Sequence, residues 1–434
     1  MFVRKYSVGW SQRVGFLSSE MINSLKNRSV LWVHAVSVGE VHAAIPMIRL
    51  LKERFPDKKL IFSTVTVTGH KTVAAKIKGI DGLFYFPFDI PWIIKRVIRM
   101  LHPSIFIFFE TEIWPNLLGN LKKNGIPSVL VNGRISNRSF SRYLKIKWLM
   151  KEWIGNISLA LMQTEEDRFK MLELGADPCR IMTTGNTKYD QLKQPDKIPF
   201  GQISVLGQWD WWVAGSTHPG EEEMILNAYL RLRNEFPRLG LIIAPRHPER
   251  FSEVSGLIEQ KGIFYSRKSQ LKNETVWKSH FPPVILLDTI GELSEFYYWA
   301  TIAFIGGSLV PKGGHNILEA VIWGKAPFFG KYSENFKEMV QIFKENNAGI
   351  EISSEEELVP KIGLYLKNKN LLEEKGKTAL KTLHENQGAT DRNMDLIEKL
   401  ISEATGSASA ERGVRGHRRT RSAARAPESE RYEN

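Results

Sequence analysis

The chain has 434 residues, of which 42% are hydrophobic, which is enough for two sizeable cores. Its formal charge of +13 favours an acidic partner such as a nucleotide, an anionic lipid or a nucleic acid. A single cysteine, Cys179, excludes an internal disulfide framework, and no apolar run approaches the ~18 residues of a membrane-spanning helix. Residues 1–25 lack the apolar centre of a signal peptide, so we expect a soluble or membrane-surface cytoplasmic protein.

Short apolar runs alternate with amphipathic helical patterns from residue 30 onward. Helices are expected at residues 40–55 and 68–78. The strands that we expect in this half are residues 31–36, 59–65, 83–86, 105–110, 128–131 and 159–163. Apolar strands joined by helices predict a parallel, doubly wound sheet.

The same rhythm occurs a second time after a break at residues 191–207, where Pro195, Pro199 and Gly201 predict a linker. A helix is expected at residues 221–235. The strands that we expect here are residues 211–214, 239–244, 285–287, 302–305 and 326–329. We therefore predict an α/β protein with two doubly wound domains that meet across a central cleft, with ligands outside the carboxyl ends of the strands.

Composition divides the chain further. The two domains are expected at residues 30–190 and 208–403, the second including the terminal helices. Residues 404–434 are rich in arginine, alanine, serine and glycine, and they predict a disordered basic tail.

Acidic residues follow two strands of the first half. Glu40 in SVGE opens a helix after the first strand, where it could act as a general base or simply favour the helix dipole. Glu110 and Glu112 in ETEIWPN follow the most apolar strand, so that a carboxylate there is desolvated unless it is paired. The alternative is that one of them caps the helix that Pro115 starts. Two carboxylates could also indicate a glycoside hydrolase, but the domain pattern is not that of a barrel.

Basic residues complete the candidate site of the first half. Arg134 and Arg138 in NGRISNRS could bind a carboxylate or phosphate, or could be ordinary loop arginines. Lys188 in TTGNTKYD stands just before the linker and could hold a leaving phosphate.

Glycine-rich and basic segments follow the strands of the second half. GSTHPGEEE opens a helix for which Ser216 or Thr217 is a candidate cap, and APRHPERF places Arg246 at a strand end. DTIGEL offers backbone groups to a base. In GGSLVPKGGHNILEA, Asn316 and Glu319 could form a capping box, or Glu319 could accept hydrogen bonds from ribose hydroxyls. Together these loops predict a nucleotide site.

Several other site types are disfavoured. There is no Walker lysine motif and no GxGxxG after the first strand, which argues against a P-loop NTPase or a dehydrogenase. The histidines are not spaced as metal ligands, and His34, His42 and His70 are expected to be packing or capping residues.

In this order, SVGE, FFETEIWPN, NGRIS, GNTKYD, GSTHPGEEE, APRHPERF and GGHNILEA resemble the 3-deoxy-D-manno-octulosonic acid (Kdo) transferases of lipopolysaccharide assembly. The resemblance covers residues 30–400 and implies a GT-B fold with two Rossmann-like domains. It also implies CMP-Kdo as the donor, a lipid A precursor (lipid IVA) as the acceptor, and inversion without a metal ion or other cofactor.

The resemblance assigns roles residue by residue. Glu40 matches the proton acceptor, and Glu110 and Lys188 match the residues that stabilise the transition state. The positions that match the CMP-binding segments are Pro245, Arg246, Ile290, Gly291, Glu292, Asn316, Ile317, Leu318 and Glu319.

Residues 1–29 depart from the family, whose members typically begin with an apolar anchor. Basic and aromatic residues alternate here, including Arg4, Trp10, Arg13 and Phe16, so that we expect either an anchor upstream or a membrane-proximal segment that contacts an anionic membrane surface. An ordinary helix that packs on the first domain is the alternative. The expected location is the cytoplasmic face of the inner membrane.

Two other functions are compatible with parts of the sequence. A GT-B-type nucleotide-sugar epimerase would share the two domains and the phosphate site. A nucleic-acid-binding module built on the arginine-rich tail would leave the strand-end motifs unexplained, so no nucleic acid partner is expected.

Overall fold

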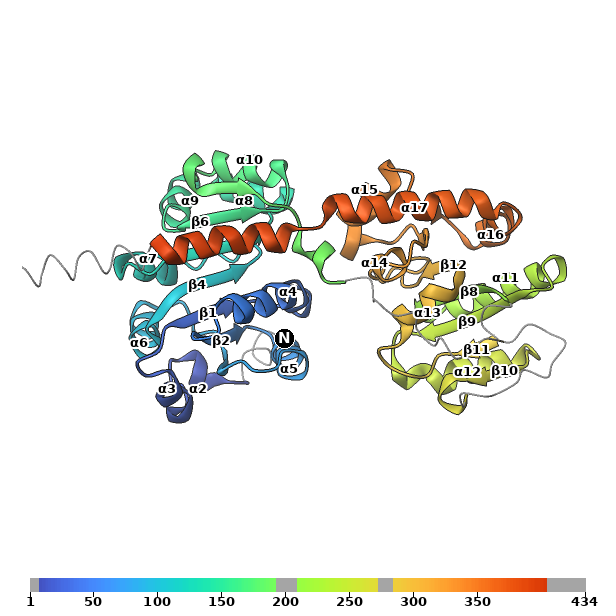
Figure 1. Ribbon diagram of the computed structural model, residues 1–434, viewed down its shortest axis with the longest axis horizontal. Coiled ribbons are helices and arrows are strands. Elements are labelled where there is room, and N and C mark those ends of the chain that lie inside the picture. Colours follow the sequence, from blue (N-terminus) through green and yellow to red (C-terminus); the bar gives the residue numbers. More distant parts are fainter. Residues whose placement is uncertain (1–7, 193–208, 272–283, 404–434) are drawn as a thin grey trace, which may run out of the picture. The chain divides into compact units, whose positions relative to one another are not determined.

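The computed structural model describes residues 8–192, 209–271 and 284–403. The chain divides into two compact units (Figure 1). The first unit comprises Met1–Gln191 together with Gln387–Asn434, and the second comprises Leu192–Asn386. Most of the expected linker and the whole expected tail lie outside the described residues, so those two predictions stay untested.

The first unit contains a parallel sheet of seven strands in the order β3-β2-β1-β4-β5-β6-β7. Its strands are β1 (Val30–His34), β2 (Lys59–Thr64), β3 (Gly82–Tyr85), β4 (Pro103–Phe109), β5 (Ser128–Gly133), β6 (Leu159–Met162) and β7 (Ile181–Thr183). The central strands are buried along nearly their whole length, because helices cover both faces of the sheet. The order reverses between β1 and β4, which makes their carboxyl ends the switch point of this sheet.

Helices connect these strands. They are α2 (Trp10–Arg13), α3 (Ser19–Leu25), α4 (Val38–Arg54), α5 (Val67–Lys76), α6 (Pro91–Leu101), α7 (Pro115–Lys123), α8 (Asn137–Leu144), α9 (Lys147–Ile154) and α10 (Glu165–Glu173). Neither Glu110 nor Glu112 is the N-cap residue of α7, which is Trp114. The carboxylate of Asp89 instead accepts hydrogen bonds from the backbone N–H groups of Asn116 and Leu117, at 2.9 and 2.8 Å.

The second unit repeats this architecture with a parallel sheet in the order β10-β11-β9-β8-β12-β13-β14. Its strands are β8 (Asp210–Thr217), β9 (Leu239–Pro245), β10 (Tyr265–Arg267), β11 (Val284–Leu286), β12 (Ala300–Ile305), β13 (Pro327–Gly330) and β14 (Ile350–Ile352). The order reverses between β8 and β12, so the loops after these two strands flank its switch point.

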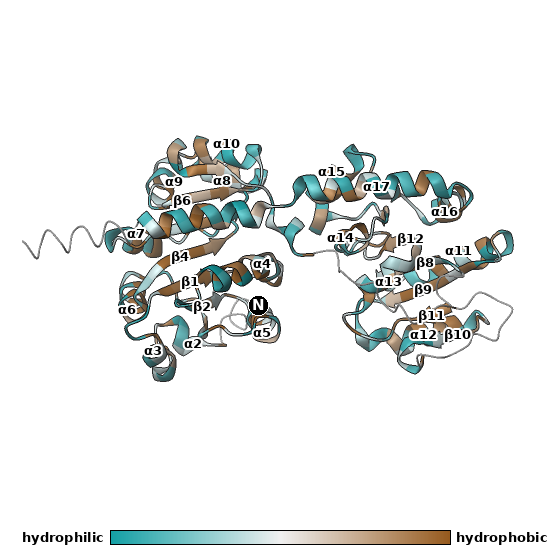
Figure 2. Cartoon of the chain, viewed as in Figure 1, coloured by the Kyte–Doolittle hydropathy of each residue, from teal (hydrophilic) through white to brown (hydrophobic). Residues whose placement is uncertain are grey.

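The helices of the second unit are α11 (Glu221–Glu235), α12 (Phe251–Gln260), α13 (Leu293–Trp299), α14 (Leu318–Val321), α15 (Lys337–Glu345), α16 (Leu358–Lys367) and α17 (Lys369–Asn386). Their apolar sides pack on the sheet, while polar side chains cover their outer faces (Figure 2). The predicted fold class, with two doubly wound α/β domains, is confirmed.

One domain boundary was wrong. The sequence grouped residues 387–403 with the second domain, but the structure places them in the first unit, where residues 389–403 form a helix. Met394, Ile397 and Ile401 of this helix are buried in a core cluster with Leu31 and Val33 of β1. An amphipathic helix at the end of a chain can cover either sheet, and its own pattern does not say which.

Among the described residues, no helix combines the length and the apolar character that crossing a bilayer requires. The N-terminal residues from Trp10 to Leu25 form two short helices on the first unit. Trp10 packs edge-on against Phe88, with ring centroids 5.4 Å apart, and the guanidinium of Arg13 lies over the ring of Tyr85. Part of this segment therefore packs on the domain, as the alternative of an ordinary packed helix had it, while contact with a membrane stays untested.

Candidate functional site

Glu40 lies where β1 gives way to α4, at the switch point of the first sheet. Ser37 is the N-cap residue of α4, and its hydroxyl donates a hydrogen bond to Oε1 of Glu40 at 2.8 Å. The backbone N–H of Val36 donates to Oε2 at 2.7 Å. The carboxylate turns back toward the end of the strand as in a capping box, but it bonds to the N–H of the residue before the N-cap.

Burial governs the protonation of Glu40. The residue is 7% exposed, and this desolvation raises the pKa of its carboxyl to about 7, while the hydrogen bonds from Val36 and Ser37 oppose the shift. The negative charge of Glu110 raises the pKa further, and Glu112 adds a smaller contribution. A carboxylate with a pKa near neutrality can both take a proton and release it, as a general base must.

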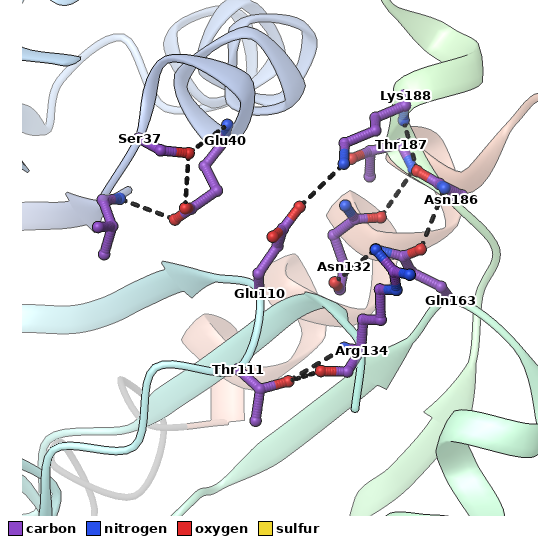
Figure 3. A network of polar contacts seen from close by, with 11 residues as sticks. Ser37, Glu40, Glu110, Thr111, Asn132, Arg134, Gln163, Asn186, Thr187 and Lys188 are labelled. Carbon is purple, nitrogen blue, oxygen red and sulfur yellow. Dashed lines mark hydrogen bonds and ion pairs between the residues drawn. The ribbon is translucent and has the colours of Figure 1, made fainter. Parts of the chain in front are cut away.

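Glu110 follows β4, the neighbour of β1, and its side chain extends between Glu40 and Lys188 (Figure 3). Its backbone has φ of 54°, a left-handed conformation that non-glycine residues adopt rarely and that often marks functional loops. Nζ of Lys188 lies 3.1 Å from Oε1 of Glu110. Sequence reasoning named both residues, and the structure brings them together as an ion pair beside Glu40.

A network of amides holds the turn that carries Lys188, the 3-10 helix η2 (Thr187–Asp190). Oδ1 of Asn132 accepts a hydrogen bond from the backbone N–H of Thr187 at 3.0 Å, and Oδ1 of Asn186 accepts one from the N–H of Lys188 at 2.9 Å. Gln163 connects the two asparagines, since its amide donates to the carbonyl of Asn132 and accepts from Asn186 (Figure 3). These residues fix Lys188, and the sequence analysis did not single them out.

The two arginines of NGRISNRS have different positions. The backbone N–H of Arg134 donates to the hydroxyl of Thr111 at 3.1 Å, which ties the loop after β5 to the loop after β4 (Figure 3). Arg138 is an exposed residue of α8. Of the two, Arg134 lies closer to the strand ends that carry Glu110.

In the second unit, Glu221 joins the two loops at the switch point. It is fully buried, and its carboxylate accepts hydrogen bonds from the backbone N–H of His218 and from those of Gly307, Ser308 and Leu309, at 2.7–3.0 Å. One side chain thus connects the loop after β8 to the glycine-rich loop after β12. The sequence analysis gave Glu221 no role.

The cap predicted for α11 was wrong, and the helix near Asn316 begins later than the capping-box alternative required. The N-cap residue of α11 is Gly220, while Ser216 and Thr217 belong to strand β8. Near Asn316 the helix is a single turn that begins at Leu318, with Ile317 as its N-cap residue. Oδ1 of Asn316 accepts the N–H of Leu318 at 3.1 Å, so Asn316 stabilises the turn from the position before its N-cap residue.

The other nucleotide-site candidates also lie at strand ends. Pro245 is the last residue of β9, and the backbone N–H of Arg246 bonds to the carbonyl of Thr217 at 3.0 Å. Ile290 to Glu292 lie between β11 and α13, where Gly291 has φ of 94° and the side chain of Ile290 is 80% exposed. Among the described residues, no three acidic, histidine or cysteine side chains are placed to hold a metal ion.

These two parallel sheets, each with polar and charged side chains at its switch point, define a fold of the GT-B type with two Rossmann-like domains. The UDP-N-acetylglucosamine 2-epimerase of Neisseria meningitidis, whose crystal structure was solved with UDP-N-acetylglucosamine bound, has the same fold. Its TM-score is 0.56 over 86% of this chain and 100% of the epimerase, with 14% sequence identity. A similar enzyme from Listeria monocytogenes also gives 0.56, at 13% identity over 87% of this chain and 97% of that one.

Sequence comparison identifies the family. Residues 8–191 match the family described as 3-deoxy-D-manno-octulosonic-acid transferase (kdotransferase). The 3-deoxy-D-manno-octulosonic acid transferase of Haemophilus influenzae is 35% identical over 92% of this chain and 92% of its own length. The enzyme of the same name from Rickettsia felis is 32% identical over 91% of this chain and 84% of its own. This chain therefore belongs to the Kdo transferase family and is a glycosyltransferase of lipopolysaccharide biosynthesis.

Proposed function

We propose that this enzyme transfers Kdo from CMP-Kdo to a lipid A precursor, lipid IVA, with inversion at the anomeric carbon and without a metal ion or other cofactor. The observation that carries the proposal is Glu40, a buried carboxyl whose pKa is raised to about 7 at the switch point of the first sheet. Family membership supports the sugar that is transferred. We infer CMP-Kdo as the donor, lipid IVA as the acceptor and the roles of the site residues in addition to this family membership.

Glu40 would act as the base. Each of its oxygens accepts one hydrogen bond from the protein and keeps a lone pair for an acceptor hydroxyl. The acceptor oxygen forms a bond to the anomeric carbon of Kdo as its proton passes to Glu40. The bond from that carbon to the phosphate oxygen breaks at the same time, and CMP leaves with the electron pair.

The Glu110–Lys188 pair would stabilise the charges that develop during this step. The anomeric carbon becomes positive as the bond to phosphate lengthens, and the carboxylate of Glu110 can lie against that charge. The leaving phosphate becomes more negative, and the ammonium of Lys188 can neutralise it. An ion pair at 3.1 Å is suited to this task, because it places a carboxylate and an ammonium group side by side, one for each developing charge.

The second unit would bind the nucleotide. Arg246 supplies a cation for the phosphate, and the loop of Ile290 to Glu292 offers backbone groups to the cytosine. Glu319 would accept hydrogen bonds from the ribose, on the turn that Asn316 stabilises. Ile317 and Leu318 are buried and would contribute the backbone of that turn, while Pro245 ends β9 directly before Arg246.

The first unit carries a surface suited to an anionic membrane. Phe16 and Trp92 are exposed, and the guanidinium of Arg96 on α6 lies 4.2 Å from the centre of the Phe16 ring. Trp148 is 72% exposed on α9, which also carries Lys147. Exposed indole rings with neighbouring cations are typical of residues that lie at a membrane surface. We therefore place the enzyme at the cytoplasmic face of the inner membrane, with no nucleic acid partner.

The test is incubation of the purified enzyme with CMP-Kdo and lipid IVA in detergent, followed by mass spectrometry of the lipid. We expect a mass gain of whole Kdo units, with and without EDTA. Loss of the product in EDTA would contradict the metal-free step alone. An isomerised nucleotide sugar with unchanged lipid would indicate an epimerase and would refute transfer.

A further inference from the structure

Two histidines from different loops of the second unit meet nitrogen to nitrogen. His218 follows β8 and His315 follows β12, and their Nε2 atoms are 2.9 Å apart. The ring planes differ by 6°. A hydrogen bond of this kind requires one ring to carry its proton on Nε2 and the other to carry it on Nδ1.

The carboxylate of Glu221 fixes the two loops that carry this histidine pair. Its buried carboxylate accepts the backbone N–H of His218 itself and those of Gly307 and Ser308, at the start of the loop that carries His315. Gly307 has φ of 69°, and a Cβ there would lie 3.1 Å from the His315 ring. The backbone is therefore shaped so that the two rings can approach.

The surroundings of the pair are strongly basic. Arg246, Lys312 and Arg250 act electrostatically on His218, and the ring of His247 lies 5.3 Å from it, edge to face. Arg246 and His247 act in the same sense on His315. These side chains come from the loops after β8, β9 and β12, so they gather at the switch point, where nucleotides bind in folds of this kind.

The carboxylates near this cluster already have partners, which are Arg250, His247 and backbone N–H groups. Arg250 pairs with Glu222 and Glu253, and Glu249 lies 3.9 Å from His247. Glu221 is saturated by backbone N–H groups. A bound anion would therefore be the charge best placed to balance Arg246, Lys312 and the histidines.

In the free protein both histidines are neutral at physiological pH. Burial, together with the nearby cations, lowers the pKa of His218 and of His315 to about 4. An anion bound among these groups acts in the opposite direction, because it favours the charged imidazolium.

We propose that binding of the donor's phosphate in this cluster is coupled to the uptake of one proton by the His218–His315 pair. This inference rests on the proposed function, because it takes the ligand to be a nucleotide phosphate. The proton comes from solvent and adds to Nδ1 of the ring whose Nε2–H already donates. The result is an imidazolium that still donates to its neighbour across the 2.9 Å contact.

The coupling has a use in the reaction. The phosphate of a CMP-sugar is a diester with one negative charge, and it leaves as a monoester that gains a second. A pair that carries one extra proton balances this second charge as it develops. The pair would thus contribute to departure of the leaving group without giving its proton away.

NMR of the full-length enzyme labelled with 15N-histidine tests the coupling directly. Ring nitrogen shifts distinguish imidazolium from each neutral tautomer, and His218→Asn and His315→Asn assign the two signals. We expect both rings to be neutral at pH 6 without ligand and one of them to be an imidazolium with saturating CMP. Cytidine, which lacks the phosphate, should leave both neutral.

Neutral rings in the CMP complex would overturn the inference while leaving CMP as a ligand. Absence of CMP binding would refute the donor assignment and the inference together.

A binding measurement provides a second test. CMP affinity of the wild type should increase up to tenfold for each unit that the pH falls toward about 5, relative to His315→Asn measured in parallel. The comparison removes the contribution of CMP's own ionisation. His384→Asn, at an exposed position on α17, serves as the matched control and should follow the wild type. Identical pH dependence of His315→Asn and the wild type would contradict the coupling.

Discussion

Replacing Glu40 by glutamine separates its chemical role from its structural role. The amide oxygen of glutamine can accept the hydrogen bond from Val36, and its NH₂ group can donate to the hydroxyl of Ser37, so that the capping arrangement is kept. What is lost is the ability to take a proton. We expect kcat to fall by about 10²–10⁴-fold, the usual contribution of a general base.

The same substitution should stabilise the fold at alkaline pH. The carboxyl has a folded-state pKa of about 7 against an ordinary value of 4.5, so that ionised Glu40 opposes folding. This difference corresponds to about 3 kcal/mol above pH 7 and vanishes below about pH 4.5, where the carboxyl is protonated in both states. Glu40→Gln should therefore unfold at a higher denaturant concentration than the wild type at pH 8, and at a similar one at pH 4.5.

The assay is the pH profile of kcat/KM together with urea unfolding at pH 4.5 and 8. At saturating donor, wild-type kcat/KM for the lipid acceptor should rise about tenfold per pH unit up to about pH 7 and then level off, because the base must be ionised. Glu53→Gln, an exposed position on the same helix α4, is the control and should change neither property. Normal turnover of Glu40→Gln would refute the base assignment. Unchanged stability at pH 8 would refute the buried, up-shifted carboxyl.

Three further substitutions test other parts of the structure. Lys188→Met removes the cation that pairs with Glu110, so the uncompensated charge of Glu110 should raise the pKa of Glu40 further. The acidic limb of the pH profile should then move to higher pH, and a profile that does not move would contradict this electrostatic link. Glu221→Gln places an amide NH₂ against backbone donors, and a loss of about 2–4 kcal/mol is expected in urea unfolding of the second unit. Ile397→Ala should destabilise the first unit by about 2–5 kcal/mol, while the exposed Lys399→Ala should not; equal effects would mean that this helix does not complete the core.

The sequence predicted the central strands well because their burial on both faces leaves continuous apolar runs. It missed β7, β10 and β14, which are three-residue strands toward the sheet edges. Such short strands need few apolar residues, and in β10 every residue is partly exposed. These strands form because they pair with a neighbouring strand, and the local sequence pattern contains no information about that pairing.

The candidate site shows a similar division. Glu40, Glu110 and Lys188 were recognised from motifs at strand ends, and topology brings the strand ends of β1 and β4 together. The Glu110–Lys188 contact depends on Asn132, whose side chain holds a turn 55 residues further along the chain. The local pattern of apolar and polar residues contains no information about a hydrogen bond between residues so far apart in the chain. The histidines of GSTHPGEEE and GGHNILEA were visible as residues, but only the fold makes them neighbours.

The return of residues 387–403 to the first unit has a consequence for the order in which the protein can be completed. Leu31, Val33 and their neighbours are covered by side chains that are synthesised more than 200 residues after the last strand of their own sheet. The second unit is one uninterrupted stretch of chain. The first unit, in contrast, keeps part of its apolar surface exposed during translation until residues 389–403 have been synthesised. A fragment that stops at residue 191 would leave that apolar surface exposed and should be prone to aggregate. A peptide of residues 389–403 that is added back should reduce the aggregation.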